Sequence, residues 1–391
     1  MTAAPEHSTR VEFANSLRGL AALSVLISHY LGVFWLKREI TANFANAPIL
    51  PSDEFPLPLY VRLLHPIESF DWGSFGVGLF FLISGFVIPF SLQRYDWKAF
   101  AVGRFFRLYP TYAAGLTLCI VAIYLSGLYF GRDFPYSASE VALHYLVGAR
   151  DLTWSRSIDG IIWTLEIEVH FYLLCALAAT WLRRGSFLLL IVPLAILAGS
   201  LLLGRHMAGW GVHNAPAYHL GYVATFNGQF LIYMFIGVAF NLHHRGILRS
   251  GTLPFVAAGL FGLFAATWYC SVHRDFFDQI WSYGAALAVF CAAAGLSDRW
   301  PRSRLLSFSA DISYPLYVVH GVAGYVALRI LLDLGVESWL SVAFVTAAAI
   351  GLAWAVHVWI EAPTHRLGQR LAKGQTALPS AAIEPIRSTG R

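Results

Sequence analysis

The chain has 391 residues, of which 57% are hydrophobic and only 13% are charged, and its formal net charge at pH 7 is +5. A soluble globular protein has about 25% charged residues, so this composition excludes a soluble domain and predicts an integral membrane protein. The positive charge requires no nucleic-acid partner, because the distribution of basic residues follows the predicted membrane topology.

Apolar segments recur along the chain, and about 20 apolar residues are enough to cross a bilayer as a helix. The sequence predicts an all-α, polytopic membrane bundle with about ten transmembrane helices, at residues 14–36, 73–91, 108–130, 159–182, 186–204, 220–241, 252–271, 279–297, 312–332 and 338–360. We expect one membrane domain at residues 1–368 and a disordered cytoplasmic tail at 369–391, which is rich in Ala, Pro and Ser.

The basic residues also predict the orientation of the bundle. With the N-terminus in the cytoplasm, most of the 27 lysine and arginine residues lie in cytoplasmic segments, which is the positive-inside pattern. We therefore expect both termini in the cytoplasm and a multi-pass protein of the inner (plasma) membrane. The long, proline-rich external segment 37–72 is expected to fold over the site.

Arg18 and His29 lie eleven residues apart in the first predicted helix. Eleven residues advance about 16 Å and turn about 20° beyond three full turns, so both side chains lie on one face, Arg18 near a membrane surface and His29 near the midplane. Ionisable side chains at such depth are costly and by default face a cavity, a pathway or a catalytic site. The pair predicts half of a site.

The second and third predicted helices add small and basic residues. The segment GVGLFFLISGFVI contains glycines that permit close helix packing, and Ser84 within it is a candidate hydroxyl of the site. In the motif RFFRLYP, Arg104 and Arg107 share one helix face at the cytoplasmic entry of the third helix. Two interpretations stand: a membrane anchor that reaches the lipid headgroups, or a clamp for phosphate groups, to which Arg18 on the same side would add.

The fourth predicted helix carries Glu166, Glu168 and His170 within an otherwise apolar run. Glu166 and His170 share one face, and Glu168 lies on another face with Thr164 and Tyr172. Two inward faces predict one internal ion pair and one carboxylate of the site, and the sequence leaves open which glutamate has which role.

The ninth predicted helix begins with ISYPLYVVHGVAGY, in which Ser313, Tyr317, His320 and Gly324 form one stripe. His320 lies ~12 Å from the cytoplasmic end of that helix, and we expect it at a depth similar to that of His29 and Glu168. The sequence contains no Gly-rich phosphate loop, no GxSxG elbow and no HExxH zinc motif, so no metal site is predicted.

These residues match the needs of acyl transfer from a cytoplasmic thioester. Arginines at the inner mouth would hold the phosphates of a donor, and a histidine would act as a base near neutral pH, oriented by a carboxylate. The same residues could line a transporter or flippase, so residue spacing alone does not decide between the two classes.

A resemblance to a known family favours the first class. The ordered segments SLRGLAALSVLISHY, FFLISGFVI, RFFRLYP, WTLEIEVHFYLL, ISYPLYVVH and WIEAPTHR resemble the successive motifs of the acyltransferase 3 family, over residues 14–368. Members of that family are integral membrane acyltransferases that modify bacterial surface polysaccharides, lipid-linked sugars and some small molecules. The family's functional positions fall here on Arg18, His29, Arg104, Arg107, Glu168 (with Trp163 and Tyr172 in register), Tyr317, His320, Glu361 and Pro363.

The sequence departs from the family pattern beside Glu168. Val169 and His170 stand where a second carboxylate and a glutamine are common, and Glu166 stands where a small residue is common. These differences leave the local pairing, and with it the acceptor preference, open. Some members carry a fused esterase-like domain, which we do not expect here.

The resemblance implies an O-acyltransferase that moves an acetyl group from acetyl-CoA, on the cytoplasmic side, to a hydroxyl of a cell-surface or lipid-linked carbohydrate. Arg18, Arg104 and Arg107 would bind the donor, and His29, Glu168, Tyr317 and His320 would form the catalytic set. The transferred group could instead be succinyl or another acyl group, and the transfer could pass through a covalent acyl-histidine. A transporter or flippase, or a related scaffold without turnover, also remains open. The sequence does not predict the oligomeric state.

Overall fold

The computed structural model describes residues 12–148, 150–210, 215–300 and 303–374, and these residues form helices and connecting loops without a β-strand. The helices are α1 Glu12–Ser28, α2 Phe34–Leu36, α3 Arg38–Ala45, α4 Leu59–Leu64, α5 Trp72–Arg94, α6 Trp97–Phe130, α7 Ala138–His144, α8 Ile162–Leu177, α9 Ala179–Arg184, α10 Ile191–Trp210, α11 Ala215–His244, α12 Leu253–Tyr269, α13 Ile280–Gly295, α14 Arg304–Asp311, α15 Ser313–Val319, α16 Gly321–Asp333, α17 Ser338–Val356 and α18 Ala362–Gly374. Two π-helical turns, His29–Val33 and His357–Glu361, follow α1 and α17.

Helices occupy all ten segments that were predicted to cross the membrane. Among the described residues, seven helices are long and apolar enough to span a bilayer, or eight if the bent pair α15–α16 counts as one span. The fourth predicted span differs because it breaks at Ala178 between α8 and α9, and α12 is a shorter apolar helix of 17 residues. Ten spans and two cytoplasmic termini therefore remain predictions.

The tail was predicted to begin at residue 369, but α18 continues to Gly374, so residues 369–374 are helical. Gly368 of α18 lies against Phe106 and Gly103 of α6. The remainder of the predicted tail, 375–391, lies outside the described residues.

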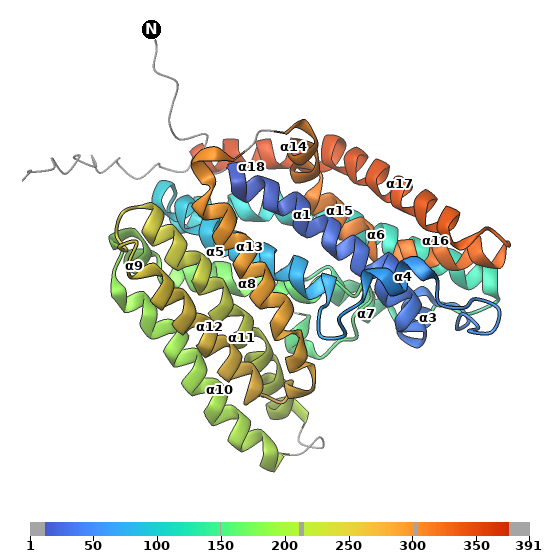
Figure 1. Cartoon of the computed structure of the whole chain (residues 1–391), viewed down its shortest axis with the longest axis horizontal. Coiled ribbons are helices and arrows are strands. Elements are labelled where there is room, and N and C mark those ends of the chain that lie inside the picture. The colour runs from blue at the N-terminus through green and yellow to red at the C-terminus, as the bar shows by residue number, and fades with distance from the viewer. Residues whose placement is uncertain (1–11, 149, 211–214, 301–302, 375–391) are drawn as a thin grey trace, which may run out of the picture.

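Two groups of helices pack on either side of α1 (Figure 1). One group contains α5 with α10, α11, α12 and α13, and the other contains α6 with α15, α16, α17 and α18. Helix α1 contacts α5 and α13 in the first group and α15 in the second. This central position brings the polar residues of α1 against both halves of the bundle.

The segment 37–72 packs against the π-helical turn that follows α1, and its position outside the membrane and over the site remains a prediction. The imidazole Nε2 of His65 donates to the carbonyl of Leu31, 3.0 Å away, within the first π-helical turn. The guanidinium Nε of Arg329 on α16 donates to the carbonyl of Pro48, and the side-chain amide of Asn46 donates to that of Asp133. Segment 37–72 is thereby attached to α1, α16 and the loop after α6.

The glycines of the second predicted helix permit close packing, as expected from the sequence. A Cβ atom at Gly76 would lie 2.6 Å from the carbonyl oxygen of Ala21 on α1. A Cβ atom at Gly85 would collide with the carbonyl oxygen of Met234 on α11, and one at Gly237 would collide with that of Leu82. Helix α5 therefore touches the backbones of both α1 and α11.

Gly85→Ala is expected to destabilise the bundle by about 1–3 kcal/mol, because the added methyl group separates α5 from α11. Thermal unfolding of the detergent-solubilised protein measures the change. Gly262→Ala on α12 is the matched control and should be neutral, because no atom lies within 4 Å of the position that its added methyl group would take. Equal melting temperatures for the two variants would contradict the close α5–α11 contact.

Candidate active site

Three arginines from two helices gather at one end of the bundle, and we call them the arginine group: Arg18, Arg104 and Arg107. Arg18 on α1 interacts electrostatically with Arg104 and Arg107 on α6, and with Glu168 on α8. Arg104 donates from Nη2 to the hydroxyl of Ser91 at 2.6 Å, and its guanidinium lies 5.3 Å from the ring centroid of Tyr172. The predicted clustering of the three arginines is present in the structure.

Glu168 lies with the arginine group and accepts two hydrogen bonds at Oε1. The hydroxyl of Tyr172 donates to it at 2.6 Å and that of Ser84 at 3.1 Å. The sequence predicted Glu168 at the same depth as His29, but the structure places Glu168 closer to Arg18. Helix α5 runs antiparallel to α1, with Gly73 beside Ser28 and Gly76 beside Ala21, so Ser84, eleven residues past Gly73, lies near the level of Arg18.

Glu166 forms the internal ion pair that the sequence assigned to one of the two glutamates. Nε and Nη2 of Arg150 donate to the two carboxylate oxygens of Glu166 at 2.8 and 2.5 Å, and the backbone N–H of Asp151 donates to Oε1 at 3.1 Å. The Glu166 side chain is 1% exposed. Its charge is fully partnered, so Glu168 is the carboxylate that stays with the candidate site.

His170 shares the face of α8 that carries Glu166, away from Glu168, and extends the polar network of that glutamate. The amide Nδ2 of Asn227 on α11 donates to Nδ1 of His170 at 3.1 Å and to Oδ2 of Asp151 at 3.0 Å. Because Asp151 also donates its backbone N–H to Glu166, this network joins the loop before α8 to α11. These contacts are structural links between α8, α11 and the loop.

His29 and His320 form a pair of imidazoles whose ring centroids are 4.7 Å apart. His29 is the first residue of the π-helical turn after α1, and His320 is the single residue between α15 and α16, which meet at an angle of 56°. The side chain of His320 is fully buried, whereas His29 is partly exposed. Helix irregularities of this kind frequently occur at functional sites.

The hydrogen bonds of the pair define how each imidazole is held. Nδ1 of His320 lies 2.8 Å from the carbonyl of Leu316, which can only accept, so Nδ1 carries the proton. The buried Nε2 of His320 has no hydrogen-bond partner among the described residues. Nδ1 of His29 lies 2.9 Å from the hydroxyl of Tyr325, whose ring stacks on the imidazole at 5.5 Å.

Tyr317 lies between the histidine pair and the arginine group. Its hydroxyl is 2.7 Å from Oγ1 of Thr164, which donates its own proton to the carbonyl of Ile161, so Tyr317 is the donor. The ring centroid of Tyr317 lies 6.0 Å from that of His320, and its hydrogen-bond partner Thr164 lies one helical turn before Glu168 on α8. The predicted residues therefore form a sequence in space from the arginine group through Tyr317 to the histidines.

A second π-helical turn faces the arginine group. Nδ1 of His357 and Oε2 of Glu361, its first and last residues, are 2.8 Å apart. Glu361 interacts electrostatically with Arg107 and Arg18. Glu361, which the resemblance placed among the functional positions of the family, thus supplies a second carboxylate to this end of the bundle.

Sequence reasoning missed Tyr325 and the two π-helical turns. Tyr325 follows His320 by five residues, and its contact with His29 depends on the close approach of Gly324 to the Tyr30 ring, which no sequence pattern shows. No residue pattern in LISHYLGVFW marks the π-helical register that begins at His29.

Among the described residues, no group of three or more His, Cys, Asp or Glu side chains is arranged to hold a metal ion.

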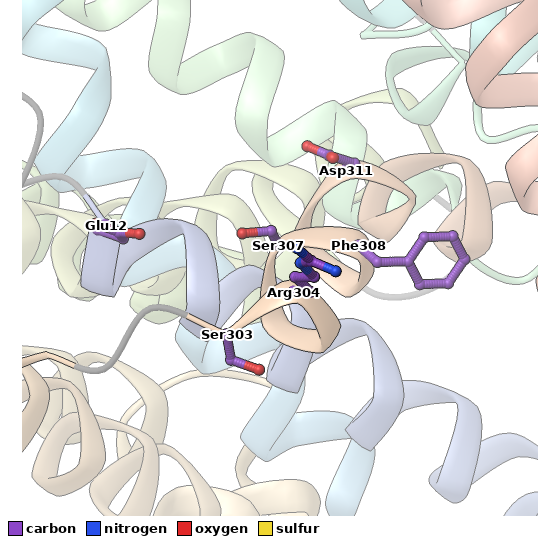
Figure 2. A pocket seen from close by; sticks show the side chains of 6 residues that line it. All are labelled: Glu12, Ser303, Arg304, Ser307, Phe308 and Asp311. Atoms are coloured by element: carbon purple, nitrogen blue, oxygen red, sulfur yellow. The ribbon is translucent and has the colours of Figure 1, made fainter.

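An open pocket of about 420 Å³ lies beside the start of α1 and α14 (Figure 2). It is lined by Glu12, Ser303, Arg304, Ser307, Phe308 and Asp311. None of these residues belongs to the arginine group or the histidine pair.

Comparison with known proteins gives two matches. Residues 11–358 match the profile of the family described as acyltransferase domain. The chain is also 26% identical over 324 residues to Nodulation protein 10 of Rhizobium leguminosarum bv. viciae, a match that covers 75% of this chain and 82% of that protein. No solved structure gives a significant match.

Arg150→Ala is expected to destabilise the protein by about 3–5 kcal/mol, because it leaves the buried Glu166 carboxylate without its partner. Thermal unfolding in detergent measures the loss, and Glu166→Gln in the same chain should restore part of it.

Arg156→Ala is the control for this prediction. Arg156 pairs with Glu140 at 2.8 Å, but its side chain is 61% exposed, and exposed pairs contribute about 0–1 kcal/mol. Arg156 and hydrogen bonds from Ser137 lower the pKa of the Glu140 carboxyl to about 2, so this pair is charged at neutral pH. If the two alanine variants lost equal stability, the buried ion pair would not be the stronger link.

Proposed function

Because this chain belongs to the acyltransferase 3 family and is therefore a membrane-embedded acyltransferase, we propose that it transfers an acetyl group from acetyl-CoA to a hydroxyl of a cell-surface or lipid-linked carbohydrate. The donor would bind from the cytoplasmic side of the inner membrane. Its phosphates would contact the arginine group, and its thioester would reach the histidine pair.

The observation that carries this proposal is the separation of the two polar groups along one rigid helix. Arg18 lies on α1 and His29 is the first residue of the π-helical turn that continues α1, about 16 Å further along the axis. Acyl-CoA has a matching distribution of chemical groups, with phosphates at one end and the thioester at the end of a long, narrow arm. Three guanidinium groups suit the phosphates, and the buried imidazoles suit the proton transfer.

The proposed reaction is direct transfer. The acceptor hydroxyl oxygen bonds to the thioester carbonyl carbon, the carbon–sulfur bond breaks, and the hydroxyl proton passes to His29. The imidazolium then protonates the departing thiolate, which leaves as the free thiol of CoA. A transient acyl-His29 would use the same imidazole as nucleophile instead, and trapping of radiolabelled acetyl on the protein distinguishes the two routes.

The electrostatics of the arginine end also support an anionic donor. Three arginines face two carboxylates, Glu168 and Glu361, and Glu168 is further held by the hydroxyls of Ser84 and Tyr172. The group therefore keeps a net positive charge. Consumption of the acetyl-CoA thioester by the purified protein would favour the enzyme over a transporter or flippase.

His29→Ala is expected to lower the transfer rate by about 10²- to 10⁴-fold, which is the usual contribution of a general base. The assay follows radiolabelled acetyl from acetyl-CoA into the glycans of inverted membrane vesicles. His206→Ala is the matched control, because His206 is exposed on α10 and contacts Trp210. A His29→Ala variant with the wild-type rate would refute the proposed chemistry.

Arg104→Ala is expected to raise the KM for acetyl-CoA by about 10- to 100-fold, the loss of one charge-assisted contact, with little change in kcat. The same vesicle assay, run over a range of donor concentrations, measures both constants. Arg184→Ala, an exposed arginine at the end of α9, controls for loss of positive charge. A fall in kcat at unchanged KM would argue against a role of Arg104 in donor binding.

A further inference from the structure

We propose that Tyr325 is the positioning residue for His29: its phenolic oxygen accepts the Nδ1 proton of His29 and leaves Nε2 of His29 bare to receive the proton of the acceptor hydroxyl. This assignment rests on the proposed function, in which His29 is the base. It is based on the hydrogen-bond geometry, the burial of Tyr325 and the comparison with His320.

The contact between the two side chains fixes the imidazole in two ways. Nδ1 of His29 and the hydroxyl of Tyr325 are 2.9 Å apart, and the two rings stack with an interplanar angle of 16°. The Tyr325 side chain is 3% exposed. The hydrogen bond sets which nitrogen faces Tyr325, and the stacking prevents the ring from turning away.

The tautomer follows from the chemistry that the base performs. A neutral imidazole has one protonated and one bare nitrogen, and only the bare nitrogen accepts a proton. Nδ1 is directed at Tyr325, so Nε2 is the nitrogen available to a substrate. His29 can act as a base there only if Nδ1 carries the proton, and the phenolic oxygen then serves as its acceptor.

His320 shows the same arrangement without needing a tyrosine. The Leu316 carbonyl accepts the proton on Nδ1 of His320 and leaves its Nε2 bare. Both imidazoles of the pair would thus be held through Nδ1 and present Nε2. Because His320 is fully buried and His29 is partly exposed, His29 is the member that a substrate reaches. The partner of Nδ1 of His29 is the side chain of Tyr325, so the assignment can be tested by substitution.

The backbone around the pair is arranged so that Tyr325 can reach α1. Any Cβ at Gly324 would collide with the ring of Tyr30, the neighbour of His29. The hydroxyl of Tyr30 donates to the carbonyl of His320 at 2.7 Å, which joins α1 to the bend between α15 and α16. This close contact places Tyr325, which follows Gly324, against His29, which precedes Tyr30.

The test uses Tyr325→Phe, which retains the stacked ring and removes only the hydroxyl. The transfer rate at saturating acetyl-CoA, measured in inverted vesicles, should fall on the order of 10- to 100-fold, part of the effect of a general base, while the KM for acetyl-CoA stays constant. The acid limb of the rate–pH profile should move to lower pH, because the protonated imidazole loses the oxygen that stabilises it.

Tyr233→Phe is the matched control. The hydroxyl of Tyr233 is also buried and donates to a carbonyl, that of Tyr283, at 2.8 Å, but it lies on α11 away from the histidines. Both variants lose one buried hydrogen bond, so a structural role alone predicts equal losses and unchanged pH profiles. That result would overturn the proposal.

A second measurement reads the tautomer without relying on activity. Nitrogen NMR of the purified full-length protein in lipid nanodiscs, with ¹⁵N-labelled histidine, distinguishes protonated Nδ1 from protonated Nε2, and the signal lost in His29→Gln identifies His29. We expect protonated Nδ1 in the wild type and a mixture of tautomers in Tyr325→Phe. Protonated Nε2 in the wild type would refute the assignment. A wild type that transfers no acetyl group but has the expected tautomer would refute the proposed function. It would still support the assignment of Tyr325 as the hydrogen-bond partner that sets the tautomer of His29.

Discussion

The contact of α1 with both halves of the bundle is the constraint on which the candidate site depends. On one side, Gly76 allows α5 to touch the backbone of α1 at Ala21, and on the other, Gly324 allows α16 to touch Tyr30. A side chain at either position would push the helices apart. The same two contacts bring Arg18 near Glu168 and His29 near His320, so helix packing and site geometry have one origin.

The two glutamates of α8 show how an apolar bundle can hold charge in two different ways. Glu166 is neutralised by a bidentate arginine and also accepts a backbone N–H. Glu168 is held by two hydroxyl groups and lies among arginines that outnumber it. A buried carboxylate with its own counter-ion serves the fold, whereas one that only partly balances a cationic group leaves that group able to bind an anion.

Sequence reasoning predicted the helices, the shared face of Arg18 and His29, and the stripe that carries Tyr317 and His320, because helical periodicity and the cost of buried charge determine these features. It placed Glu168 at the depth of His29, and the structure places it near Arg18. Depth depends on how α8 and α5 are offset along α1, and single-helix periodicity contains no information on offsets between helices. Tyr325, the π-helical turn at His29 and the 56° bend at His320 arise from tertiary contacts, and they escaped prediction for the same reason.

The irregular backbone at His29 has a physical explanation. A π-helical turn releases carbonyl groups from the usual ladder, and in an apolar bundle each released group needs a new donor. Here the side chain of His65 donates to Leu31 and the indole of Trp35 donates to Tyr30. The extra residue of the π-helical turn comes after Ser28, so the α-helical register that relates Arg18 to His29 is preserved, and only the segment beyond His29 is rotated. The irregularity therefore changes what surrounds the imidazole without changing its distance from the arginine group, and that distance is what a donor with phosphates at one end and a thioester at the other would have to match.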